Sequence, residues 1–369
     1  MVKYALILAF SYPKILDATY DIQSLTSCMS DICMITDLCR NIGIEKRNIT
    51  IITDLTRKIR SDIYECNIRI NSYPSDIFVC REICQFIENT IRGIEDSSYK
   101  GDNDNPEVLL YISGHGEKIN IDGKNNQGIT LTSEDGKNLK YLLSKDLFNI
   151  IFGNFMIDSE ARMSVPIYSK IKIQRRVENE TKKMLVIETI GVEEHILFQL
   201  SPTIASPQSS PDMLRPYRSS YMTNRGLPVS SKLLTIVDTC YSEHMTYFPF
   251  IYESRTDNMI PTSNFNIDIG IDLPYCVTIS SCESNKTSQF STSGSSLTKI
   301  LFMQLCEFKG KLSLSQLNYL IYNSSNRIIN ELIRNECTHP IITSTINSSE
   351  IDIPFFNILQ VKKMVIIDK

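Results

Sequence analysis

Two segments of the sequence place a reactive side chain just beyond an apolar run that predicts a β-strand. VLLYIS (108–113) leads into His115, which has a glycine on either side, and LLTIVDT (233–239) leads into Cys240. The carboxyl ends of neighbouring parallel strands meet at one edge of a sheet, where reactive groups gather. A thiol beside an imidazole supplies a nucleophile and a proton carrier for acyl transfer. The spacing therefore predicts a Cys–His catalytic pair.

The remaining thiols and imidazoles favour ordinary structural roles. A lone cysteine after a strand is commonly a core residue, and a lone histidine is commonly a surface or capping group. It is the combination of His115 with Cys240 that favours catalysis. Cys282 also follows a strand, but no glycine-flanked histidine accompanies it, so a structural role is expected. The other histidines lack the spacing of metal ligands: His195, His244 and His339.

The elements that must position these residues alternate between strand and helix patterns. Short apolar runs indicate strands at 4–10, 48–53, 108–113, 233–239 and 275–281. Apolar residues spaced three and four apart indicate helices at 25–42, from Pro74 onward, at 295–308 and at 314–333. Strands that are apolar throughout and separated by amphipathic helices are typical of a parallel sheet covered on both faces. The sequence therefore predicts an α/β fold.

Between the third and fourth of these strands lies an insertion of different character, at about 155–228. Residues 170–190 carry a charged pattern that predicts a β-hairpin turning near Asn179 and Glu180, and the Ser/Pro-rich residues 201–221 indicate a loop. The basic residues of this hairpin lack the interleaved aromatic side chains that nucleic-acid binding uses. A solvated surface hairpin is therefore the favoured interpretation.

Composition excludes several classes of protein. The 369 residues carry 38 Lys and Arg against 42 Asp and Glu, a net charge of −4, and 42% are hydrophobic. This balance excludes a disordered chain and gives no reason to expect a nucleic-acid partner. No apolar run approaches the roughly 18 residues of a membrane span, so no membrane partner is expected. The 11 cysteines contain no C-x-x-C pair, which argues against zinc and disulfide frameworks and for a reducing, cytoplasmic location.

Further motifs resemble one family across nearly the whole chain. The matching segments, in order, are KYALILAFSY, LTSCMSD, ITIITD, YISGHG, VDTCYS, ISSCESNKTSQF and THPIITST. Together they resemble the motifs of the metacaspases, which are caspase-like cysteine peptidases. The resemblance implies a caspase-like three-layer sandwich, in which a mostly parallel six-stranded sheet lies between helices. It also implies one catalytic domain over 1–369, with a large-subunit-like part at 1–252, a small-subunit-like part at 270–369 and no prodomain.

The resemblance assigns roles to individual residues. It makes Cys240 the nucleophile and His115 the general acid and base, with an oxyanion hole formed by the backbone N–H groups of Gly114 and Cys240. The positions that match the family's P1 pocket are Cys28, Asp31, Ser113 and Asp238. Two carboxylates at the base of one slot favour a cationic side chain and repel an acidic one. We therefore expect a cysteine endopeptidase that cleaves protein or peptide substrates after Arg or Lys through a thioester.

Some positions depart from the family pattern. Tyr241 stands where the family has a histidine after the nucleophile, and Glu243 stands where it has a glycine. The resemblance also implies calcium, but calcium requires clustered oxygens and Asp146 stands alone beside Lys145, so no metal site is predicted. One alternative is a catalytically weak scaffold that binds partners through the 155–228 insertion. Another is a hydrolase of non-peptide acyl groups, which the paired carboxylates disfavour.

Overall fold

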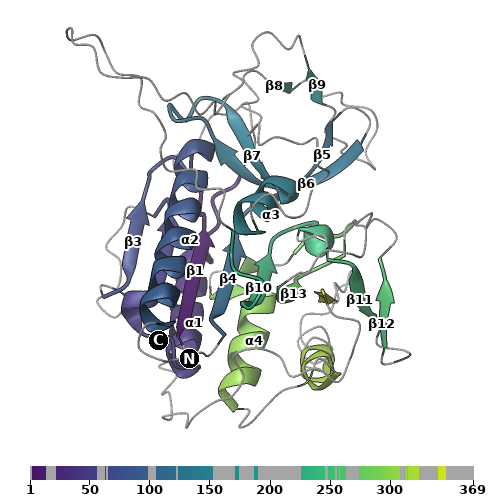
Figure 1. The fold of residues 1–369 in the computed structure, drawn as a ribbon. Helices are drawn as coiled ribbons and strands as arrows, with labels where there is room; N and C mark the ends of the chain where they lie inside the picture. Colours follow the sequence, from purple (N-terminus) through teal and green to yellow (C-terminus); the bar gives the residue numbers. More distant parts are fainter. Residues whose placement is uncertain are drawn as a thin grey trace, which may run out of the picture.

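A nine-stranded β-sheet forms the centre of the protein (Figure 1). The computed structural model describes residues 2–13, 22–55, 63, 65–98, 105–121, 124–152, 171–173, 187–189, 226–245, 248–253, 256, 258–262, 274–283, 285–288, 290–291, 293–307, 313, 315–323 and 340–345. In sheet order the strands are β12 (Asn258–Pro261), β11 (Phe250–Glu253), β16 (Ile341–Ser344), β13 (Tyr275–Ser280), β10 (Lys232–Asp238), β4 (Glu107–Ser113), β1 (Lys3–Ala9), β2 (Ile49–Thr53) and β3 (Asn67–Ile70). The run from β13 to β3 is parallel, and β16, β11 and β12 extend it through antiparallel pairings. The predicted α/β fold with a mostly parallel sheet is confirmed, but the sheet has nine strands rather than the six expected.

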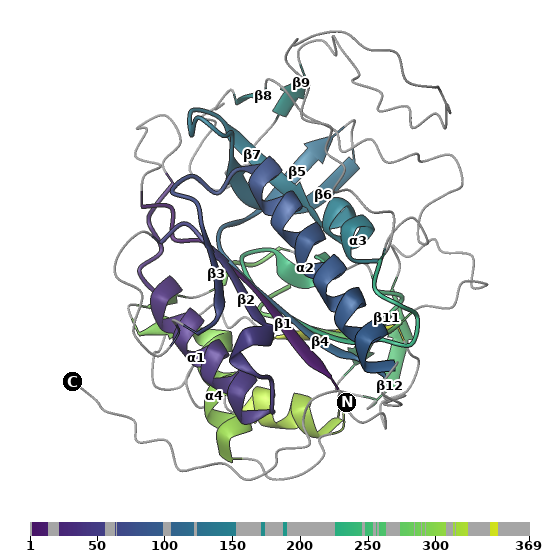
Figure 2. The ribbon, with the colours of Figure 1, turned by 60° about the vertical axis from the view of Figure 1, so that its left-hand side comes forward.

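Helices cover both faces of this sheet (Figure 2). One face carries α1 (Cys28–Asn41) and α4 (Ser296–Glu307), and the other carries α2 (Asp76–Ser98) and α3 (Ser144–Phe152). Successive residues of a strand alternate between two buried clusters: Ile7 packs in the cluster that contains α1 and α4, and Leu6 and Leu8 pack in the one that contains α2 and α3. Because both faces are buried, a central strand such as β1 is apolar without interruption.

Most of the predicted helices are observed, with small shifts at their ends. The helices expected at 25–42, from Pro74 and at 295–308 correspond to α1, α2 and α4. Residues 315–323 are helical, and the rest of the helix expected at 314–333 lies outside the described residues. Within the described part of the chain, no helix is both long and apolar enough to span a membrane.

A second, antiparallel sheet sits beyond the carboxyl end of β4. It contains β5 (Gly116–Ile121), β6 (Lys124–Thr132) and β7 (Leu139–Leu143), in that order. These strands were not predicted, because β5 and the first half of β6 are rich in Lys, Asn and Gly, which are depleted in strands. Ile129 and Leu131 of β6 join the buried cluster beneath α2, so the small sheet is anchored to the main one. This anchoring fixes the loop that carries His115.

The remaining described strands are short pairs. β8 (Ile171–Ile173) and β9 (Ile187–Thr189) pair in antiparallel fashion, which confirms the hairpin predicted at 170–190. Its turn near Asn179 and the Ser/Pro-rich residues 201–221 lie outside the described residues. A second pair, β14 (Phe290–Ser291) and β15 (Gly294–Ser295), directly precedes α4.

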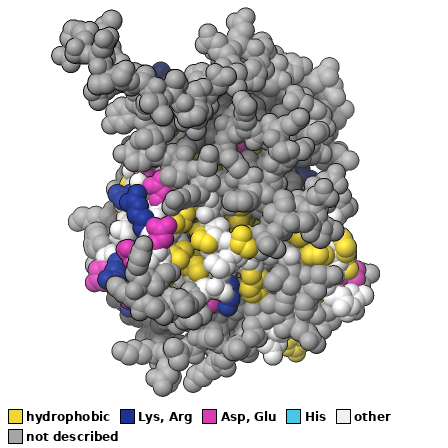
Figure 3. Space-filling view, viewed as in Figure 1, with side chains coloured by type: hydrophobic (Ala, Val, Ile, Leu, Met, Phe, Trp, Pro, Cys, Tyr) yellow, Lys and Arg dark blue, Asp and Glu magenta, His cyan; other side chains and the backbone are white. Residues whose placement is uncertain are grey.

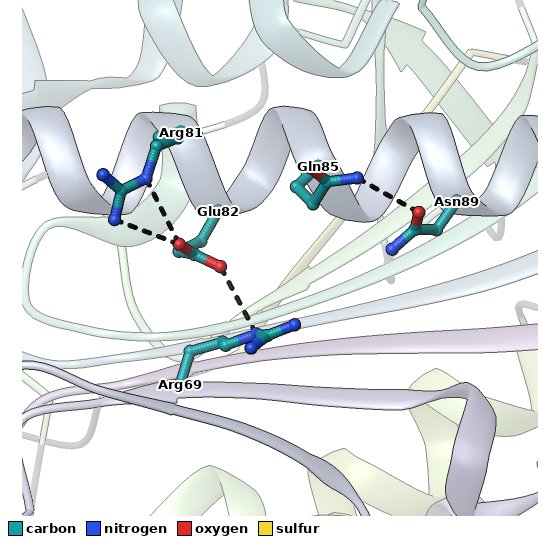
Figure 4. Close-up of polar contacts among 5 residues, drawn as sticks. All are labelled: Arg69, Arg81, Glu82, Gln85 and Asn89. Atoms are coloured by element: carbon teal, nitrogen blue, oxygen red, sulfur yellow. Dashed lines mark hydrogen bonds and ion pairs between the residues drawn. The ribbon is translucent and has the colours of Figure 1, made fainter. Parts of the chain in front are cut away.

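Charged side chains of both signs mingle at the left-hand edge of the face in Figure 3. In one such group, Glu82 of α2 lies 3.5 Å from Arg69 of β3 and 3.3 Å from Arg81 (Figure 4). One turn further along α2, Gln85 donates a hydrogen bond to Asn89 at 3.1 Å. An ion pair with an exposed partner contributes at most about 1 kcal/mol, so the Arg69–Glu82 pair, which joins α2 to β3, ties the helix to this strand only weakly.

Candidate active site

The neighbouring strands β4 and β10 bring the two predicted catalytic segments together. Ser113 pairs in register with Asp238, and His115 and Cys240 each lie two residues beyond these positions, at the same edge of the sheet. The two loops touch at Gly116, where a Cβ atom would overlap the carbonyl oxygen of Cys240. A residue with a side chain could not approach so closely. The glycine after the histidine is therefore explained by the contact between these loops.

The surroundings of His115 keep its imidazole neutral and oriented. Its backbone N–H donates to the Tyr12 hydroxyl at 3.1 Å, and its Nε2 lies 2.7 Å from the carbonyl oxygen of Gln23. A carbonyl oxygen can only accept, so Nε2 carries the hydrogen and Nδ1 is left as the basic nitrogen. Burial lowers the pKa of His115, and the bond to Gln23 partly offsets this. Within the described residues, the hydrogen bond of the imidazole goes to Gln23 and not to Cys240.

Cys240 lies half-buried at the start of a sharp turn. The next residue, Tyr241, has a φ of 56°, a left-handed conformation, and its N–H donates to the carbonyl oxygen of Lys286 at 3.0 Å. Burial raises the pKa of the Cys240 thiol to about 11, and nearby groups such as Glu117 add to the rise, while the backbone N–H of Ser288 opposes it. Cys240 of the free protein is therefore a thiol rather than a thiolate at neutral pH.

The two carboxylates predicted for the P1 pocket lie close together. Asp31 of α1 and Asp238 at the end of β10 are both fully buried. Burial, followed by the charge of Asp238, raises the pKa of Asp31 to about 7, and burial also raises the pKa of Asp238. Like charges in a low-dielectric setting oppose one another, so the pair does not readily hold two charges at neutral pH.

Donors from the segment around β15 and from α4 surround Asp238. Its Oδ2 accepts hydrogen bonds from the Ser295 hydroxyl and from both the N–H (3.0 Å) and the hydroxyl (2.8 Å) of Thr298, and its Oδ1 accepts one from the Ser288 hydroxyl (3.0 Å). Asp31 is less completely bound. Its Oδ1 accepts the Ser295 N–H at 2.8 Å, but its Oδ2 has no hydrogen-bond partner among the described residues. This oxygen is itself buried, and the nearby hydroxyls of Ser27 and Ser295 hold the pKa of Asp31 below what burial alone would give.

The other two predicted pocket residues join the same cluster. Ser113 lies opposite Asp238 on the neighbouring strand, and its buried hydroxyl also lacks a partner in the part of the chain that the structure describes. Cys28 is fully buried at the start of α1. Burial raises its pKa well above the usual range, and the charges of Asp54 and Asp31 add to this. The structure thus brings all four predicted P1 residues together.

Two backbone N–H groups at this edge match the predicted oxyanion hole. They belong to Gly114 and Cys240, and neither donates a hydrogen bond to another described residue. Gly114 is buried and Cys240 is half-buried, and a backbone N–H without an acceptor in the chain is uncommon in such surroundings. The two N–H groups are available to an oxygen atom of a substrate.

Several residues that shape this site carry little signal in the local sequence. The Tyr12 hydroxyl accepts the backbone N–H of His115, and Asp54 accepts the N–H of Tyr12. Ser295 and Thr298 donate hydrogen bonds to Asp238. The last two lie 57 and 60 positions from Asp238 in the sequence, and no local pattern signals such a contact. For Asp54 the only local signal is its place directly after a predicted strand.

The remaining predicted groups have ordinary surroundings or lie outside the described residues. The buried sulfur of Cys282 lies 3.4 Å from the carbonyl oxygen of Thr239 and 3.3 Å from that of Lys286, as expected for a structural thiol. His244 ends the short 3-10 helix η4 (Ser242–His244). His195 and His339 are outside the described residues. In the described ranges, no three His, Cys, Asp or Glu side chains form a group that could hold a metal ion, and Asp146 lies in the first turn of α3.

Comparisons with known proteins add two structural likenesses. No protein-family model and no curated protein matches the sequence. A crystal structure of a Geobacter sulfurreducens protein is 11% identical, with a TM-score of 0.49 and a match that covers 98% of this chain and 100% of that one. The crystal structure of caspase-1 from Spodoptera frugiperda is 10% identical, with a TM-score of 0.42 and coverage of 96% and 89%. At this level of similarity neither structure assigns a family or an activity to the chain.

Proposed function

We propose that the protein is a cysteine endopeptidase of metacaspase type that cleaves peptide bonds after Arg or Lys. The observation that carries the proposal is the contact of Gly116 with the carbonyl oxygen of Cys240, because it holds the histidine-bearing loop against the cysteine-bearing loop. The sequence motifs support the same conclusion, and a mostly parallel sheet between helices is the architecture that they imply.

The charges of the site favour attack by a thiol that loses its proton as the new bond forms. Because the pKa of Cys240 is raised to about 11 and that of His115 is lowered, a resident thiolate–imidazolium pair is disfavoured. The sulfur of Cys240 attacks the carbonyl carbon while its proton passes to Nδ1 of His115. The carbonyl oxygen becomes an oxyanion, which the N–H groups of Gly114 and Cys240 stabilise.

Two further steps complete the cycle. His115 gives its proton to the departing amine, the C–N bond breaks, and the acyl group remains on Cys240 as a thioester. A water molecule then attacks the thioester while His115 accepts a proton from it. The carboxylic acid leaves, and the thiol of Cys240 regains its proton from the imidazole.

The carboxylate pair supports a preference for a cationic P1 side chain. Oδ2 of Asp31 is buried without a partner in the described residues, and the Ser113 hydroxyl is a second acceptor of the same kind. Buried polar groups are normally hydrogen-bonded, so these two atoms invite a donor. A guanidinium or ammonium group would supply donors and a positive charge, which lowers the pKa of a nearby carboxylate. A P1 aspartate would instead meet like-charge repulsion.

Covalent labelling with an Arg-based acyloxymethyl ketone tests the proposal. We expect the wild-type protein to be labelled at Cys240 and to cleave an Arg-terminated fluorogenic peptide, and Cys240→Ala to do neither. Cys282→Ala is the matched control, because it removes the thiol at the neighbouring strand end and should leave the label on Cys240. Cleavage that persists in Cys240→Ala, or a wild-type protein that is neither labelled nor active, would refute the assignment.

A second candidate function is a catalytically weak scaffold that binds partners through the 155–228 insertion. It is favoured by the complete burial of Asp31 and Asp238 and by the four hydrogen bonds that Asp238 accepts. In a scaffold these bonds would hold the site closed to any substrate. The labelling experiment separates the two functions, because a closed site would leave Cys240 unlabelled in a folded protein.

A further inference from the structure

We propose that Tyr12 is a positioning residue for the catalytic His115 and that Asp54 holds Tyr12 in place. The inference rests on the proposed function, in which His115 is the general acid and base. Tyr12 lies three residues beyond β1, is fully buried and has a φ of 58°. Such a conformation is uncommon for a residue other than glycine, and it tends to occur at functional sites. Among the described non-glycine residues, only Tyr12 and Tyr241 have a positive φ, and Tyr241 follows the nucleophile.

A buried carboxylate stabilises the left-handed turn at Tyr12. β1 and β2 are parallel neighbours, and their last residues, Ala9 and Thr53, pair in register. Asp54 directly follows this pair and accepts the backbone N–H of Ser11 at 2.7 Å and that of Tyr12 at 2.5 Å. Bonds from a carboxylate to backbone N–H groups are charge-assisted and strong. They select the turn that directs the Tyr12 side chain toward the histidine loop.

The Tyr12 hydroxyl connects the histidine loop to the small sheet. It accepts the backbone N–H of His115 at 3.1 Å and donates to the carbonyl oxygen of Thr130, on β6, at 2.9 Å. The N–H of Thr130 in turn donates to the carbonyl oxygen of His115 at 2.9 Å. A Cβ atom at Gly114 would lie 2.7 Å from the same hydroxyl, so the residue before the histidine packs directly on it. The backbone of His115 is therefore fixed on both sides.

The Tyr12 ring also covers one face of the imidazole. The two ring centroids are 5.0 Å apart and the planes are inclined by 41°. Tyr12 therefore controls both the position of the His115 backbone and the exclusion of water from its ring. This burial is the main cause of the lowered pKa of His115. Tyr12 touches neither the nucleophile nor the P1 carboxylates in these contacts, so it acts through His115.

The substitution Tyr12→Phe tests the inference, because it keeps the ring and removes the hydroxyl. We expect kcat for an Arg-terminated peptide to fall about 10- to 100-fold with little change in KM, since small displacements of a catalytic group cost this much. Without the bond to the hydroxyl the loop relaxes and water reaches the imidazole. The pKa of His115, followed by NMR, should then rise toward its usual value, and the acidic limb of kcat/KM should move to higher pH. The chain has 4 histidines, so this resonance can be assigned by substitution.

Tyr4→Phe is the matched control, because Tyr4 is also buried and lies near the opposite end of β1. It should leave kcat and the His115 titration unchanged. If Tyr12→Phe does not fold, Asp54→Asn perturbs the same turn and should give the same two effects.

An unchanged His115 titration in the Tyr12 variant overturns the positioning role even if activity falls, and an equal loss of activity in Tyr4→Phe overturns it as well. The NMR titration uses no substrate. A protein without peptidase activity would therefore refute the catalytic role, and the titration would still report whether Tyr12 holds the imidazole.

Discussion

The substitution Asp31→Asn should make the protein more stable at pH 8 and should also make it less active. A carboxylate whose pKa is raised from 3.8 to about 7 in the folded state is costly to ionise there. The cost is absent below about pH 4, grows as the pH rises to 7, and is complete above that. At 1.36 kcal/mol for each tenfold change in proton affinity, its full size is about 4 kcal/mol. An asparagine carries no charge, so the variant escapes this cost.

The pH dependence of the difference between variant and wild type isolates this effect. The amide oxygen of the substituted side chain can still accept the Ser295 N–H, but the amide N–H₂ takes the place of an oxygen that has no partner in the described residues. A buried, unpaired amide costs about 1–3 kcal/mol at every pH. We therefore expect the variant to be less stable than the wild type at pH 4 and more stable at pH 8, with a relative gain of about 4 kcal/mol between the two.

Urea denaturation at several pH values, followed by circular dichroism, measures this gain. Asp37→Asn is the control, because Asp37 lies on the same helix but is partly exposed beside Arg40, where substitutions change stability little. A stability difference for Asp31→Asn that stays constant within about 1 kcal/mol from pH 4 to pH 8 refutes the reasoning on Asp31. The same variant should lose cleavage after Arg. In the wild type, KM for such a peptide should rise as the pH falls below 7, since Asp31 then becomes neutral.

Two further predictions concern Cys240 and Gly116, the glycine that contacts the carbonyl oxygen of Cys240. Because burial raises the pKa of Cys240 to about 11, its alkylation by iodoacetamide should accelerate steadily above pH 8, and a plateau below pH 8 would contradict the picture of a neutral thiol. Gly116→Ala drives a Cβ atom into a backbone oxygen, so it should cost about 1–3 kcal/mol in urea denaturation and abolish labelling of Cys240. Gly128→Ala, whose nearest contact is 3.0 Å, should be milder in both measurements, and equal effects would exclude a specific role for the contact at Gly116.

The main sheet was largely predictable from the sequence because its strands are buried on both faces. The runs at 4–10, 108–113 and 233–239 are apolar without interruption, and no other element of this chain shows that pattern as clearly. The strands of the small sheet were missed because polar residues interrupt them: Gln127, Thr130 and Thr132 are buried within β6, and Lys and Asn occupy half-buried positions of β5 and β7. The four outer strands β3, β11, β12 and β16 were missed for a related reason: each is four residues long, and a short strand gives little periodicity to detect.

The approximate location of the site followed from parallel topology, but its detail did not. Strand ends that point the same way put His115 and Cys240 at one edge, and this needed only the two apolar runs before them. The role of Tyr12 depends on a backbone angle and on a contact 103 positions along the chain, neither of which a local pattern encodes. The same holds for the donors that saturate Asp238, which come from the segment around β15 and from α4.

The edge strands of the nine-stranded sheet influence how copies of the chain can associate. Among the described residues, the two edge strands of the sheet are β3 and β12, each four residues long, and β12 ends in Pro261, which has no N–H to donate. Short strands and proline at a sheet edge are means by which proteins avoid joining their sheets end to end. Pairing of these edge strands between two copies of the chain is therefore disfavoured. The imidazole of His115 follows β4 and the thiol of Cys240 follows β10, in the middle of the sheet and within a single copy, so a monomer supplies both.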